Sequence, residues 1–95
     1  MRLMMTFKIP TAAGNAAGSH GDIGAAIEKL LADTKAEAAY FTMMDGMRAG
    51  IVIFEETDQA RLTTYNEPLM EHLGAEIDIV PVLNLDDLKR GLEGR

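Results

Sequence analysis

The histidines and tyrosines are the side chains of this sequence best suited to acid–base chemistry. His20 lies in the stretch TAAGNAAGSHGDIG, residues 11–24, at or just before the expected first turn of a helix. A helix N-terminus disfavours the imidazolium, so this ring should be neutral and able to act as a base. An exposed loop histidine without a role fits the same position. His72, near the end of a later helical pattern, is expected on the surface.

Three hydroxyl groups fall on faces that are otherwise apolar, those of Tyr40, Thr42 and Tyr65. A buried tyrosine places its hydroxyl against a partner, which is either a structural hydrogen-bond acceptor or a ligand. His20, Tyr40 and Tyr65 are therefore the candidate catalytic residues of an enzyme that works without a cofactor. Structural roles are compatible with the same positions.

Thr42, Arg48 and Asn15 are the candidate residues of a ligand pocket. Arg48 lies next to a predicted hairpin turn, where it can bind a ligand carboxylate or extend its aliphatic stem over apolar surface. Asn15 belongs to the glycine-rich stretch, which we expect to border the pocket.

The glycine-rich stretch matches no established phosphate-binding loop. A Walker A loop requires G-x-x-x-x-G-K-[ST], and residues 14–19 have neither that spacing nor the lysine. Gly18, Gly21 and Gly24 lack the paired first glycines of the Rossmann fingerprint. Anion binding at the following helix N-terminus stays an alternative. We predict instead a surface loop, mobile as a flap over a pocket, whose glycines supply positive φ values.

The sequence predicts neither a metal site nor a bound cofactor. It has no cysteine, which excludes disulfides, thiolate nucleophiles and zinc–sulfur sites. Its two histidines do not have the spacing of a metal motif, and a haem site would rest on one of them.

The net charge and the lengths of the apolar runs indicate which partners to expect. The 95 residues include 15 acidic and nine scattered basic ones, for a formal net charge of −6, so nucleic acid is not an expected partner. No apolar run is long enough to cross a membrane, and the opening stretch is too short for a signal peptide. We therefore expect a cytoplasmic protein with no membrane association.

The first half of the chain predicts a strand, a helix and a hairpin. Residues 2–9 alternate between apolar and polar side chains until Pro10 ends the strand. Ser19 and Asp22 resemble a capping box for a helix that should fade near residues 33–34. Asp45-Gly46 is typical of a type I′ hairpin turn. The pairs are then Met44–Met47, Thr42–Ala49 and Tyr40–Ile51 on one face, and Met43–Arg48, Phe41–Gly50 and Ala39–Val52 on the other.

The second half predicts a helix, a strand and a short final helix. Residues 58–73 have a helical pattern, which we expect Pro68 to break, with Asn66 capping a second piece and Gly74 ending it. The stretch AEIDIVPV, residues 75–82, predicts an edge strand with one solvent-exposed face. Asn84 and Asp87 should cap the last helix, whose apolar residues are Leu85, Leu88 and Leu92.

The element order predicts one α+β domain over residues 1–95. The order β-α-β-β-α-β plus a terminal helix is the ferredoxin-like arrangement, an antiparallel sheet of order 4-1-3-2 with both long helices on one face. The hairpin is apolar on both faces, so its second face would stay exposed in a monomer. We therefore expect a homodimer formed through the sheet faces.

The chain also resembles the dimeric α+β barrel superfamily. Within it, the stretches MMTFKIP, AGNAA, EAAYFT, DG.R.G and NEP resemble a family of short bacterial proteins of unknown function. The superfamily includes cofactor-free monooxygenases, muconolactone isomerases, haem enzymes and stress-response proteins, so the resemblance implies an architecture and no particular activity.

Three functions follow as hypotheses. The first is a small dimeric protein that binds an apolar ligand or has no catalytic role. The second is a cofactor-free monooxygenase or isomerase acting on a small aromatic or apolar substrate. The third is a purely structural or regulatory dimer without a pocket. A cavity beside the sheet, and the side chains that line it, would discriminate among them.

Overall fold

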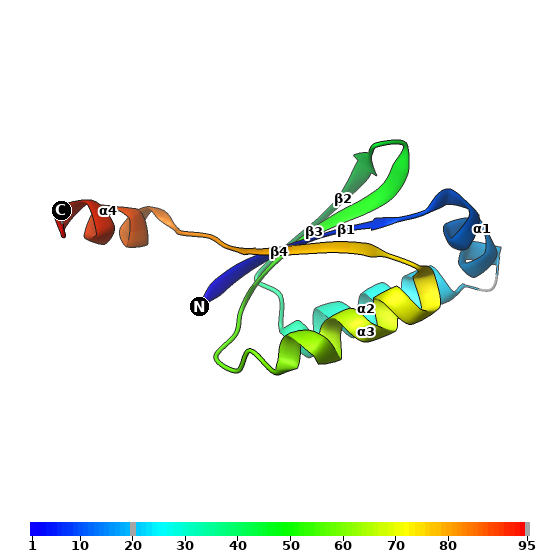
Figure 1. Ribbon diagram of the computed structural model, residues 1–95, viewed down its shortest axis with the longest axis horizontal. Helices are drawn as coiled ribbons and strands as arrows, with labels where there is room; N and C mark the ends of the chain where they lie inside the picture. Colours follow the sequence, from blue (N-terminus) through cyan, green and yellow to red (C-terminus); the bar gives the residue numbers. More distant parts are fainter. Residues whose placement is uncertain (20, 95) are drawn as a thin grey trace.

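The computed structural model describes residues 1–19 and 21–94, which form an α+β fold with a four-stranded antiparallel sheet (Figure 1). The strand order β2-β3-β1-β4 is the predicted order 4-1-3-2 read from the other edge. In sequence, the elements are β1 (Arg2–Ile9), α1 (Thr11–Ser19), α2 (Asp22–Thr34), β2 (Ala38–Met44), β3 (Met47–Glu55), α3 (Arg61–Leu73), β4 (Glu76–Pro81) and α4 (Leu85–Glu93).

The core lies between the sheet and the helices α2 and α3, which run side by side beneath it (Figure 1). The predicted alternation of β1 is confirmed, because every second residue from Leu3 to Ile9 is buried. The largest fully buried side chains come from both layers: Phe7, Phe54, Met5, Ile9, Leu69, Leu73 and Val52.

The β2–β3 hairpin has the predicted turn and register. Asp45 and Gly46 both have positive φ, 53° and 76°, as a type I′ turn requires. All six predicted cross-strand pairs are present, from Met44–Met47 to Ala39–Val52.

The prediction of a surface loop over residues 11–24 is wrong for most of that stretch. Residues 11–19 form helix α1, which begins directly after Pro10, and Gly14 N–H donates to the Pro10 carbonyl at 2.8 Å. Alanine is the best helix former, and the four alanines at positions 12, 13, 16 and 17 outweigh two glycines. Among the described glycines of this stretch, Gly21 alone has a positive φ, 75°.

The start of α2 also differs from the prediction. Its N-cap is Gly21, whereas the predicted cap residue Ser19 belongs to helix α1. The helix ends at Thr34, as predicted.

Helix α3 continues through Pro68, contrary to the predicted break. It starts at Arg61, and the apolar residues Tyr65, Leu69 and Leu73 are buried on both sides of the proline. Their packing on the core outweighs the one backbone hydrogen bond that proline removes. Asn66 caps no second piece; its buried Oδ1 has no hydrogen-bond partner among the described residues. Gly74 ends the helix with φ 60°, as predicted.

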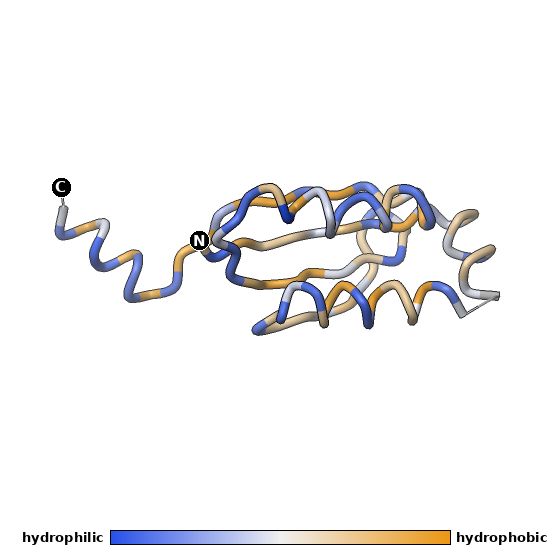
Figure 2. The backbone as a smooth tube through the Cα atoms, turned by 90° about the horizontal axis from the view of Figure 1, so that it is seen from below, coloured by the Kyte–Doolittle hydropathy of each residue, from blue (hydrophilic) through white to orange (hydrophobic). Residues whose placement is uncertain are grey.

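The C-terminal elements follow the prediction locally. β4 is an edge strand of the sheet. A capping box joins Asn84 and Asp87 at the start of α4. Helix α4 lies beyond the end of the sheet, away from α2 and α3, in two perpendicular views (Figures 1 and 2).

The sheet face opposite α2 and α3 carries an apolar centre between charged groups. The β1–β3 and β2–β3 registers place Met4, Ile51, Ile53 and Tyr40 on this open face. Charged side chains of both signs flank them, including Lys8 of β1 and Asp78 of β4. The predicted second apolar face of the hairpin is therefore not covered by the helices of the same chain.

Candidate functional site

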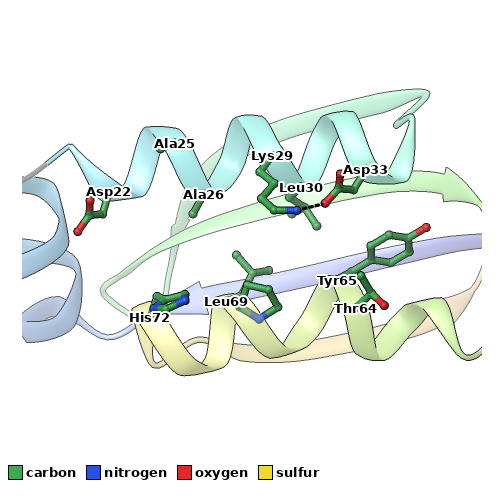
Figure 3. Close-up of a pocket in the computed structure, with 11 residues that line it drawn as sticks. Asp22, Ala25, Ala26, Lys29, Leu30, Asp33, Thr64, Tyr65, Leu69 and His72 are labelled. Atoms are coloured by element: carbon green, nitrogen blue, oxygen red, sulfur yellow. Dashed lines mark hydrogen bonds and ion pairs between the residues drawn. The ribbon is translucent and has the colours of Figure 1, made fainter.

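A groove between α2 and α3 is the candidate site (Figure 3). Its volume is about 520 Å³. Eleven residues line it: Asp22, Ala25, Ala26, Lys29, Leu30, Asp33, Thr64, Tyr65, Pro68, Leu69 and His72.

The groove has an apolar floor and a polar rim. Leu30 of α2 and Leu69 of α3, 3% and 2% exposed, lie in the space between the two helices (Figure 3). Ala25 and Ala26 contribute only a methyl group each, which keeps the space on the α2 side open. Along the rim, Lys29 Nζ forms an ion pair of 2.6 Å with Asp33, one helical turn further on.

Pro68 leaves one backbone carbonyl of α3 without its usual helical donor. Proline has no N–H, so the Thr64 carbonyl, four residues earlier, lacks the donor that an α-helix normally supplies. Both residues line the groove. A ligand with one hydrogen-bond donor can satisfy an acceptor of this kind.

Tyr65 reaches from the groove to a buried carboxylate behind it. Its hydroxyl donates a short hydrogen bond to Glu56 Oε1, and Glu56 Oε2 accepts from the backbone N–H groups of Thr57 and Asp58 at 3.0 and 3.1 Å. Arg61 lies 3.9 Å from Glu56 Oε1 and 5.5 Å from the centre of the Tyr65 ring. The Phe54 ring meets that ring edge-on, with centroids 5.6 Å apart.

This cluster holds each group in one protonation state at neutral pH. The hydrogen bond from Tyr65, followed by the one from the Asp58 backbone, lowers the pKa of Glu56 although burial opposes the charge. Burial and the bond to Glu56 raise the pKa of Tyr65 to about 12. Both shifts move the groups away from the range in which a general acid or base works best. The pair therefore fits a structural role: Glu56 anchors the turn into α3, and Tyr65 forms the wall of the groove.

The structure separates two of the predicted catalytic residues. Tyr40 is 67% exposed on the open face of the sheet, whereas Tyr65 is 4% exposed on the helix-covered side. The sheet therefore lies between the two hydroxyl groups. His20, the third candidate, lies outside the described residues.

Two of the three predicted pocket residues contact each other. Arg48 Nη2 donates to Asn15 Oδ1 at 3.0 Å, which ties β3 to α1. Gly14 makes room for this contact, because a Cβ there would lie 2.5 Å from Arg48 Nη1. Thr42 is on the open face with Tyr40 and does not join them.

No sequence motif marks the groove. Its walls come from two helices about 40 residues apart in sequence, and their spacing follows from packing on the sheet. Pro68 was the available signal, since a proline inside a helical pattern marks a carbonyl without its usual donor. His72 is exposed, as predicted, at one end of the groove.

No protein-family model and no curated protein matches this chain. Among the described residues, no three His, Asp or Glu side chains form a group that could hold a metal ion. In the same part of the chain, no helix has the length and apolar character needed to cross a membrane.

Proposed function

We propose that this protein is a cytoplasmic homodimer that binds a small, largely apolar molecule in the groove between α2 and α3. The observation that carries the proposal is the groove itself, an apolar floor of Leu30 and Leu69 bordered by a few polar groups. This is the usual composition of a small-molecule site, in which apolar area supplies affinity and a few polar atoms fix orientation. The preferred ligand carries one hydrogen-bond donor.

The arrangement of elements supports a ferredoxin-like fold assembled as a dimeric α+β barrel. The open face of the sheet has an apolar centre, and it carries both acidic and basic side chains. A surface with both charge signs can face a second copy of itself across a two-fold axis. The occupant that we assign to this face is therefore a second copy of the chain.

The dye anilinonaphthalene sulfonate, which is apolar with one charged group, tests the groove. Ala25 is an exposed groove residue of α2, and Ala25→Phe should fill the space and weaken dye binding by about tenfold or more. Ala32→Phe adds the same ring to an exposed position of α2 outside the groove and should leave binding unchanged. Fluorescence titration measures both affinities.

A third variant separates the groove from the sheet. Ile51→Lys places a charge on the open face and should leave dye affinity as it is. Equal dye affinity in Ala25→Phe and the unaltered protein would refute binding in the groove.

A further inference from the structure

The C-terminal arm, residues 82–94, has an apolar stripe that no part of the described chain covers. Leu85, Leu88 and Leu92 follow the spacing of one helix face, and Leu83 precedes them. These four leucines are 66% (Leu83), 64% (Leu85), 45% (Leu88) and 50% (Leu92) exposed, and α4 has no buried residue.

The arm extends the molecule well beyond its core. The radius of gyration is 14.8 Å, whereas a compact domain of this length has about 12.4 Å. The principal extents are 51 × 27 × 17 Å, and the arm lies at one end of the longest direction (Figure 1). A helix of nine residues is marginal in water without packing, even with a good cap. A surface that covers the leucines would supply that packing.

An apolar hollow lies at the base of the arm. It has a volume of about 720 Å³, and Met1 and Pro81, at the end of the molecule from which the arm departs, form part of its wall. Leu3, Leu62 and Ile79 add apolar surface, and Glu56, Thr57 and Gln59 complete the wall.

The arm is held away from the hollow of its own chain. Val82 N–H donates to the Arg2 carbonyl at 3.0 Å, which continues the β4–β1 pairing up to the arm. Only Leu83 and Asn84 separate this bond from the first residue of α4. Arg2 Nη1 then lies 3.4 Å from Asp87, so an ion pair fixes the first turn of the helix.

We propose that the arm packs into the hollow of a second copy of the chain, and that the second copy returns the same contact. Arm and hollow lie at the same end of the molecule, so one two-fold axis can place each arm in the hollow of the other copy. This contact would bury the four exposed leucine side chains of each copy. One charge pair fits this contact: Lys89 of the arm and Asp58, which lies between the hollow residues Thr57 and Gln59, each lack an ion pair with a described residue.

This arm contact is separate from the sheet contact and does not depend on the groove. The open sheet face lies along the body, whereas α4 extends from the end of the body (Figure 1), where Met1 and Pro81 line the hollow. With perpendicular, intersecting two-fold axes, a protein that uses both contacts contains four copies, and a protein that uses only the arm contact contains two.

Light scattering after size exclusion, at micromolar concentration, tests the arm. The double substitution Leu88→Ser/Leu92→Ser should halve the mass of the unaltered protein and raise the dissociation constant of this contact by about a hundredfold or more. Both leucines are exposed, so the chain itself should still fold. Met70→Ser removes an equally exposed apolar side chain from α3 and should leave the mass unchanged.

A hollow variant tests reciprocity. Gln59→Trp fills the hollow from an exposed position and should halve the mass as well. Mixing this variant with the arm variant restores one intact arm–hollow pair and should produce mixed species. Ile51→Lys combined with the arm variant should give single chains, which distinguishes the arm contact from the sheet contact. An unchanged mass in the arm variant would overturn the proposal, whatever the sheet variant does.

Discussion

Gly50 occupies a position where the ring of Phe7 packs directly on the backbone of β3. A Cβ at this glycine would lie 2.5 Å from Phe7 Cζ and 2.7 Å from Cε1. Phe7 is 1% exposed in the middle of the core, so its ring has no free space to enter. The absence of a side chain at position 50 is thus a packing requirement, and its φ is not positive.

Gly50→Ala should destabilise the protein by about 1–3 kcal/mol, the usual cost of forcing extra volume into a packed core. For a domain of this size, that corresponds to a fall of roughly 4–20 °C in melting temperature. Gly24→Ala is the matched control, because nothing lies within 4 Å of a Cβ there and alanine favours the helix. Thermal unfolding should show a loss for the first variant only. Equal melting temperatures would contradict the packing argument.

The Tyr65–Glu56 hydrogen bond should make stability depend on acid pH. Because the folded state lowers the pKa of Glu56, this carboxylate stabilises the fold above its ordinary pKa near 4.5. That stabilisation is lost as the pH falls through the lowered folded value. Tyr65→Phe removes the largest cause of the shift, so the variant should be less stable than the unaltered protein at pH 7, with the difference shrinking below pH 4.

Denaturant unfolding at several pH values measures this difference. Tyr40→Phe is the control, since it removes the same hydroxyl from an exposed tyrosine of β2 and should change stability little at any pH. A difference between Tyr65→Phe and the unaltered protein that stays constant from pH 7 to pH 3 would show that the bond does not favour the ionised carboxylate.

At the scale of elements, the sequence predicts the strands better than the helices. Alternation along β1 and the Asp45-Gly46 turn both act over a few residues, so the register of the hairpin follows from local information. Residues 11–19 were predicted as a loop, whereas they form a helix, because a mixture of glycine and alanine is compatible with both. The alanines favour the helix, and two long-range contacts anchor it: Ala17 is buried in the core, and Asn15 accepts a hydrogen bond from Arg48, 33 residues further on.

Pro68 shows why the site was harder to predict than the sheet. The hydrogen bond that proline removes favours a helix break, but the burial of Tyr65 and Leu69 against the core keeps α3 continuous. The consequence is a groove lined by the proline and by Thr64, the residue whose carbonyl loses its helical donor. The two tyrosines are separated for a related reason. The strand register places Tyr40 on the open face of the sheet, and the burial of α3 places Tyr65 on the opposite, helix-covered side.

At the scale of the whole molecule, the described residues leave several apolar surfaces uncovered, among them the groove, the hollow at the base of the arm, the open sheet face and the leucines of α4. The groove and the hollow are concave, whereas the sheet face is broad and the leucine stripe is convex. By the usual strand spacing, the sheet face covers roughly 450 Å² in projection. A standard interface buries about 800 Å² per partner, so the sheet contact is a small one, and the arm contact forms a second interface with its own area.

The sheet contact can be tested by charge exchange at its centre. Ile51 lies in the middle of the open face, opposite Thr6 and Tyr40 on the neighbouring strands. Near the two-fold axis of a sheet-to-sheet dimer, position 51 of one copy lies close to position 51 of the other. Ile51→Lys and Ile51→Glu should therefore each lose this contact, since like charges would be buried together.

An equal mixture of the two variants should associate again through opposite charges, which light scattering and native mass spectrometry can measure. Association of either variant alone to the mass of the unaltered protein would show that the open face is not an interface.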